Sequence, residues 1–220
     1  KGQTPGYFFG FRTDGLFQTF ADVTGHATQT GAQPGDIRYV DMNKDGVIND
    51  ADKTKIGDPF PDFTMGWNLN LEYKSFDFTA FTYASVGNEV YRAYERNANY
   101  TNKDRMILAR WTGAGTATSS KNPRYSFTDA NSNIRVSDRY VEDGSFIKLK
   151  NVQLGYTFPA KMTGKIFSKL RIYAQVRNAF TLTKYTGLDP EISGGILDTG
   201  VDRGAYPQAR TYALGIDIKL

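Results

Sequence analysis

The clearest chemistry in the sequence lies in residues 41–52, where oxygen-bearing side chains recur at the spacing of a calcium-binding loop. Ca²⁺ takes about six to eight oxygen ligands, and a glycine at position 6, here Gly46, permits the sharp turn that lets them converge. The sequence therefore predicts a Ca²⁺ site. Its ligands are the side chains of Asp41, Asn43, Asp45, Asn49 and Asp52, at positions 1, 3, 5, 9 and 12, and the carbonyl of Val47 at position 7.

The alternative for this stretch is a turn rich in Asp and Asn that holds no ion. Calcium is the better interpretation because nearby carboxylates repel one another without a cation. The loop departs from the usual pattern at position 12, where Asp52 replaces Glu. No paired helical unit follows, so we expect the ion to have a structural role, with Ile48 fixing the loop to the protein.

Other candidate catalytic groups are weak, and the sequence predicts neither catalytic residues nor an organic cofactor. His26 is the single histidine, and no Ser or acidic residue near it in the sequence suggests a triad. Glu142 and Asp143 are adjacent, so in a strand they point to opposite faces and cannot flank one glycosidic bond. The chain contains no Cys, which excludes thiol nucleophiles and disulfides. We therefore expect a protein that is not an enzyme.

The composition favours a membrane protein that crosses with strands. Mean hydropathy is −0.49, aromatic residues make up 14% of the chain, and no apolar run approaches the roughly 20 residues of a membrane helix. In a transmembrane β-barrel, lipid-facing and lumen-facing residues alternate, which keeps mean hydropathy low. The net charge of +4 comes without a dense basic run, so nucleic acid is not an expected partner.

Alternation of apolar with polar or small residues predicts several strands. It is clearest at the C-terminus, where Tyr212, Leu214, Ile216, Ile218 and Leu220 share one face, and in residues 63–73. Further strands are expected at residues 76–86, 145–158 and 170–182, and a first strand within residues 7–20. In residues 145–158 the phase changes near Lys150 and Asn151, which indicates a β-bulge.

The connections between these strands alternate in length. Lys74-Ser75 and residues 159–169 are short, whereas residues 21–62, 87–139 and 183–210 are long and polar. Outer-membrane barrels have short periplasmic turns and long extracellular loops. The fold class that follows is an all-β, antiparallel transmembrane barrel segment of about six strands.

Seven stretches, in order along nearly the whole chain, resemble the late barrel region of the SusC/RagA family of TonB-dependent outer-membrane transporters. They are residues 5–18, 34–46, 56–59, 87–91, 141–151, 155–159 and 187–191, the last reading GLDPE. One departure is Leu220, where many barrels end in Phe. The resemblance identifies residues 1–220 as a C-terminal portion of such a barrel.

The resemblance implies a function that composition and spacing do not. Family members are plugged barrels of about 22 strands in the outer membrane of Gram-negative bacteria of the Bacteroidetes type. They import glycans or peptides, with TonB acting through an N-terminal region and a SusD-like surface lipoprotein as lid. The expected partners of this chain are therefore the rest of the barrel and plug, that lipoprotein, TonB and outer-membrane lipid.

The sequence also allows two other classes of protein. A secreted, calcium-binding β-sandwich that binds carbohydrate explains the alternating strands and the calcium loop, but not the alternating loop lengths. A calcium-dependent hydrolase lacks a supporting set of catalytic residues.

Overall fold

A computed structural model describes residues 2–94, 105–163, 167–192, 194–195 and 197–219. The chain forms two compact units, each built from three stretches. Unit 1 comprises Lys1–Phe60, Glu89–Glu142 and Ile192–Gly204, and unit 2 comprises Pro61–Asn88, Asp143–Glu191 and Ala205–Leu220. No helix in the described ranges is long and apolar enough to cross a membrane.

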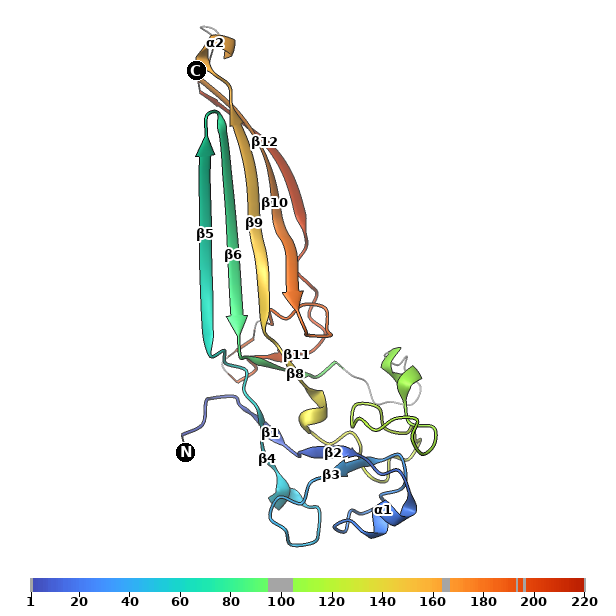
Figure 1. Ribbon diagram of the computed structural model, residues 1–220. Helices are drawn as coiled ribbons and strands as arrows, with labels where there is room; N and C mark the ends of the chain where they lie inside the picture. The colour runs from blue at the N-terminus through green and yellow to red at the C-terminus, as the bar shows by residue number, and fades with distance from the viewer. Residues whose placement is uncertain (1, 95–104, 164–166, 193, 196, 220) are drawn as a thin grey trace. The chain divides into compact units, whose positions relative to one another are not determined.

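Unit 2 is built on one five-stranded antiparallel sheet (Figure 1). The strand order is β12-β10-β9-β6-β5, so β12 and β5 are its edges and, within the described chain, the sheet does not close into a barrel. Its strands are β5 (Phe63–Tyr73), β6 (Phe76–Val86), β9 (Phe146–Thr157), β10 (Lys169–Thr183) and β12 (Thr211–Lys219), which confirms five of the predicted strands. Leu220 lies outside the described residues.

The sheet has one apolar face because the register places apolar residues directly opposite one another on all five strands. Many of these side chains are exposed: 54% of Trp67 and 88% of Leu214 is accessible. In the described part of unit 2 there is no second sheet to cover this face, which is contrary to a β-sandwich. One complete cross-strand row consists of Leu71, Phe78, Leu154, Ala174 and Leu214.

Two irregularities keep this face continuous along the strands. The pairing of β6 with β9 shifts opposite Lys150, which confirms the predicted bulge. The shift returns Ile147 and Leu149 to the apolar face although their sequence phase differs from that of Val152. A second shift lies in β10 between Arg177 and Phe180.

The first predicted strand, within residues 7–20, is not part of this sheet, and the prediction of about six barrel strands is therefore wrong by one in the described chain. These residues form β1 (Phe8–Gly10) and β2 (Thr13–Leu16) in unit 1. They pair with β4 (Thr54–Gly57) and β3 (Ile37–Tyr39), respectively. Gly15, with φ +78°, interrupts the extended conformation that a long strand needs.

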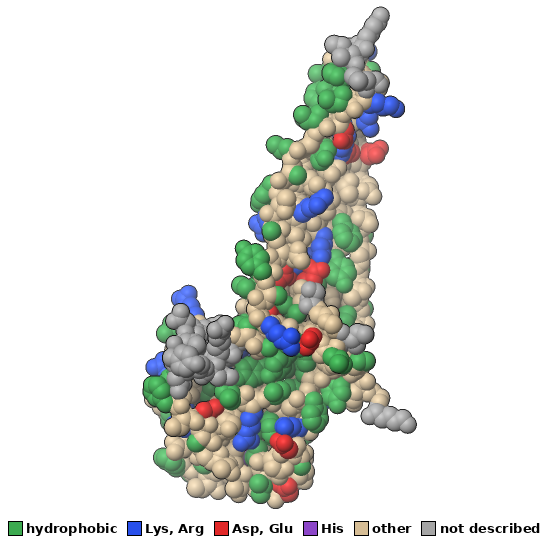
Figure 2. Space-filling view, turned by 180° about the vertical axis from the view of Figure 1, so that it is seen from behind, with side chains coloured by type: hydrophobic (Ala, Val, Ile, Leu, Met, Phe, Trp, Pro, Cys, Tyr) green, Lys and Arg blue, Asp and Glu red, His purple; other side chains and the backbone are tan. Residues whose placement is uncertain are grey.

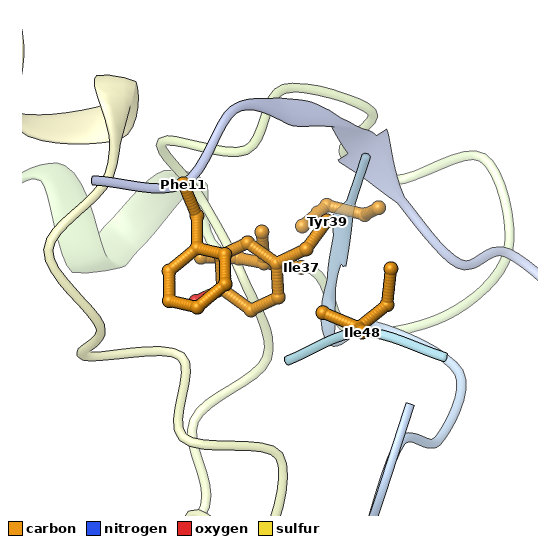
Figure 3. Close-up of a cluster of buried hydrophobic side chains, with 5 residues drawn as sticks. Phe11, Ile37, Tyr39 and Ile48 are labelled. Atoms are coloured by element: carbon orange, nitrogen blue, oxygen red, sulfur yellow. The ribbon is translucent and has the colours of Figure 1, made fainter. Parts of the chain in front are cut away.

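Unit 1 contains short elements around a small core. Phe11, Leu16, Ile37, Tyr39 and Ile48 pack together as its hydrophobic cluster (Figure 3). The remaining elements of the chain are α1 (Phe20–Thr24), η1 (Asp50–Asp52), β7 (Glu89–Arg92), η2 (Arg105–Ala109), η3 (Asp138–Tyr140), β8 (Val141–Asp143) and β11 (Val201–Asp202), with α2 (Ala160–Thr163) in unit 2.

Buried amide side chains complete unit 1 by satisfying the free backbone groups of β3. The Gln29 amide donates to the carbonyl of Ile37, and its oxygen accepts from the N–H of Tyr39. Asn133 accepts from the N–H of Ile37. Asp36, fully buried, accepts from Asn133 and from Arg124 at 2.6 Å. Stretches predicted as loops thus form an ordered unit, because side chains replace missing strand partners.

Candidate functional site

The predicted calcium loop is wound tightly by hydrogen bonds between its own side chains and backbone. Asp41 accepts from the N–H groups of Lys44 and Gly46, at 2.7 and 2.8 Å. Asn43 accepts from Asp45, and Asp45 accepts from Val47. Gly46, with φ +84°, supplies the left-handed turn. The Asn43 side-chain amide also donates to the Asp45 carboxylate at 2.8 Å. This hydrogen bond first, and then the one from the Val47 N–H, hold the pKa of Asp45 below its usual value.

The end of the loop is anchored in the protein. Ile48 is buried in the hydrophobic cluster, as predicted, and its N–H donates to the carbonyl of Thr28. Asn49 and Asp52 form a capping box around η1, and Asp52 also accepts from Met42. Among the described residues, no three Asp, Glu or His side chains are placed so that together they could hold a metal ion. The calcium site therefore stays a prediction.

The remaining chemical candidates have structural partners. Glu142 is buried and forms ion pairs with Arg92 and Lys121, whereas its neighbour Asp143 is exposed. The two carboxylates thus lie in different environments, in agreement with the exclusion of a glycosidase pair. The ring nitrogen Nε2 of His26 lies 2.8 Å from the carbonyl oxygen of Tyr39.

The polar face of the unit 2 sheet carries an ion cluster at the end near the β5–β6 turn. Arg171 donates to Asp77 at 2.6 and 2.9 Å and to Asp217 at 2.8 Å. The Arg171–Asp77 pair passes over Gly155, where a Cβ atom would collide with both side chains. Glycine is needed at this position because the ion pair occupies the space of a side chain.

A second ion cluster, on the same face, was not predicted from the sequence. The ammonium of Lys148 lies 2.6 Å from Asp189 and 2.9 Å from Glu191, and Lys150 lies 2.5 and 2.7 Å from the two oxygens of Glu191. The Lys148 side chain is only 2% exposed. No local pattern could reveal this cluster, because it joins residues about 40 positions apart.

The carboxylates of this second cluster are stabilised in their charged form. Burial acts to raise the pKa of Asp189 and of Glu191, but hydrogen bonds from Lys148 to both, and from Lys150 to Glu191, outweigh it. Both pKa values are therefore lowered. A cavity of about 310 Å³ adjoins the cluster, lined by Lys148, Asn178, Phe180, Thr181, Leu188, Asp189, Gln208 and Arg210.

Charged side chains of both signs along the sheet are visible in Figure 2. Between the two ion clusters, the polar face carries carboxamides. Gln175 donates to Asn151 at 2.7 Å, and Gln153 lies opposite Gln175 on the neighbouring strand. Such a surface offers hydrogen-bond donors and acceptors without a concentration of one charge.

Proteins of known identity are similar in sequence to this chain over most or all of its length. It is 35% identical, over all its residues, to TonB-dependent receptor P3 of Formosa agariphila, of which it spans 22%. It is 32% identical to TonB-dependent receptor SusC of Bacteroides thetaiotaomicron over 85% of this chain, which corresponds to 18% of that receptor. The chain thus spans about a fifth of the length of these relatives.

Solved structures show the same fold. The RagAB peptide importer in its open-open state matches with a TM-score of 0.73 and 22% identity, over 98% of this chain and 22% of that one. The closed-closed state matches with a TM-score of 0.69 and 23% identity, over 97% of this chain and 23% of that one. No protein-family model matches the chain.

Proposed function

Because this chain belongs to the SusC/RagA family of TonB-dependent receptors, we propose that its unit 2 forms part of the wall of an outer-membrane nutrient importer. The cargo class is glycan or peptide, and a SusD-like surface lipoprotein is the proposed partner. The proposed function of this chain is therefore in transport and not in catalysis. The resemblance to SusC and to RagAB supports both parts of the proposal.

The observation that carries the proposal is the two-faced sheet. An apolar face as exposed as that of Trp67 and Leu214 is costly in water, whereas it is stable against hydrocarbon. The opposite face, with its ion clusters and carboxamides, suits a water-filled or protein-filled lumen. Strands of 9–15 residues are long enough to span a bilayer when tilted.

The two unpaired edges of the sheet indicate that further strands of a barrel are partners of this chain. In a membrane, unpaired backbone groups of β5 and β12 would face hydrocarbon, which costs several kcal/mol per group. We therefore propose that the rest of the barrel pairs with both edges, enclosing a plug on which TonB acts. The short β5–β6 turn then lies in the periplasm, and unit 1 lies outside the cell.

This topology predicts the labelling of two introduced cysteines. Thr118→Cys lies in an exposed part of unit 1, and Ser75→Cys lies in the β5–β6 turn. On intact cells, an impermeant maleimide should label Thr118→Cys and leave Ser75→Cys unlabelled, whereas both should react after the outer membrane is permeabilised. Labelling of Ser75→Cys alone on intact cells would show that the sheet has the opposite orientation in the membrane.

We further propose that residues 41–52 bind Ca²⁺ through Asp41, Asn43, Asp45, Asn49, Asp52 and the carbonyl of Val47. The donor set suits a hard cation, and a carboxylate oxygen that accepts one N–H still has a lone pair for a metal. The ion would offset the charge of the loop and stabilise its ordered form by mass action. Its role would be structural.

The calcium proposal predicts different effects at two aspartates of the loop. Asp45→Ala removes a central ligand and should abolish Ca²⁺ binding in isothermal titration calorimetry, together with the rise in melting temperature that Ca²⁺ causes. Asp50→Ala is the control, because Asp50 lies between ligand positions and pairs with Lys53 at the surface. Equal binding by both variants, or none by the unmodified protein, would reject the site.

A further inference from the structure

We propose that residues 184–191, here called the strap, are latched onto the polar face of the sheet by Lys148 and Lys150, and that cargo import requires this latch to open. The proposal rests on the proposed function, because it takes the polar face as the lumen of an importer. The new element is the movement of the strap, which does not follow from the fold or from the proposed function.

The location of the strap follows from the register of the sheet. Lys148 lies between Tyr83 on β6 and Thr181 on β10, on the polar face, and the ammonium of Lys150 lies over the ring of Tyr83. Asp189 and Glu191 contact these two lysines, so the strap lies on that side of the sheet. In a barrel, this is the lumen, at the end of β9 and β10 away from the β5–β6 turn (Figure 1).

The strap is held by side chains and not by a strand ladder. Its described residues form neither helix nor strand. Tyr185 is buried and its N–H donates to the Thr183 hydroxyl, while Asp189 accepts from the N–H of Gln208. A segment held in this way can detach as a unit without breaking the pairing of β9 with β10.

The energetics of the latch permit two states. Two ammonium groups face two carboxylates, so the closed cluster is electrically balanced. Desolvation of buried charges opposes their attraction, so the net stability of such a cluster is small compared with the strength of each contact. In the open state, water in a lumen can solvate all four groups. Removal of one partner, in contrast, leaves a buried charge uncompensated and should release the strap.

The latch is tested by hydrogen–deuterium exchange of the strap in the full protein, purified from outer membranes. Glu191→Gln and Lys150→Met should each accelerate exchange of the strap by about tenfold, and the double variant should add little to either. Asp198→Asn, which removes an exposed ion pair with Arg203, is the control and should leave the strap unchanged. Independent, additive effects of Glu191→Gln and Lys150→Met would show that the two residues do not hold the strap as one latch.

The need for opening is tested by locking the strap. Leu188 on the strap and Thr181 on β10 line the same cavity, so cysteines at both positions can be joined by a reducible bismaleimide. We expect uptake by cells to fall by about tenfold on cross-linking and to recover on reduction. The control pair, Arg177→Cys with Thr211→Cys, joins neighbouring strands and leaves the strap free.

Uptake is measured with two labelled probes, a mixed oligopeptide pool and a mixed maltooligosaccharide pool. Undiminished uptake by the fully cross-linked Leu188–Thr181 variant would show that import does not require the strap to open. It would not contradict the proposed importer function. Uptake of neither probe by the unlinked protein would instead count against the proposed function and, with it, against the strap.

Discussion

Replacing Leu214 with arginine should lower the free energy of unfolding in a bilayer by about 2–4 kcal/mol, whereas the same change at Ala213 should lower it by less than about 1 kcal/mol. The two residues are adjacent on β12 and point to opposite faces. Leu214 belongs to the apolar cross-strand row, so an arginine there would meet hydrocarbon. Ala213 lies opposite Gln175 on the polar face, where an arginine stays hydrated.

The measurement is reversible folding of the full-length protein into lipid vesicles, followed through denaturant titration. Because the two positions are adjacent on one strand, they lie at the same distance from the sheet edge. In water both positions are exposed, so a soluble protein would tolerate both arginines equally. Equal, small losses at Leu214 and Ala213 would therefore exclude contact of this face with lipid.

Replacing Phe17 with alanine should destabilise unit 1 by about 3–5 kcal/mol, because it opens a cavity in a buried site. Phe17 is fully buried, and its ring packs against that of His26 at 5.3 Å between centroids. Its backbone also pairs with Gly35 and Asp36. Phe20, three positions later, is 70% exposed, so Phe20→Ala should change stability by no more than about 0.5 kcal/mol.

This pair of variants tests whether the long connections form a folded unit. Limited proteolysis of intact cells should cut Phe17→Ala within residues 1–60 at protease concentrations that leave the unmodified protein and Phe20→Ala uncut. Heat-resistant barrel structure should be unchanged in both variants. If the unmodified protein is cut as rapidly as Phe17→Ala, residues 1–60 do not form a stable core.

The strands of the sheet could be predicted because each carries its own signal. Alternation in residues 63–73 and 211–219 reports two environments locally, and even the bulge near Lys150 is visible as a change of phase. Strands do form within residues 7–20, but their place was predicted wrongly, because they pair in unit 1 and not in the large sheet. Phe8, Phe11 and Phe17 are instead buried in unit 1.

Long-range polar contacts could not be predicted from one sequence. Gln29, Asp36, Asn131 and Asn133 read as loop residues, yet they are buried and replace the partners of a strand. Likewise Lys148 reads as a surface lysine until Asp189 is placed beside it. The calcium loop is the opposite case, since its spacing is local but ion binding depends on a partner that the sequence does not contain.

Contact of the apolar face with lipid can be measured directly from the accessibility of a spin label at Leu214→Cys and at Ala213→Cys in the protein reconstituted into bilayers. A label facing lipid collides more often with apolar O₂, and a label facing water collides more often with a polar nickel chelate. We expect O₂ to have the better access at position 214 and the nickel chelate to have clearly better access at position 213. Preferential access of the nickel chelate at both positions would show that this face does not meet lipid.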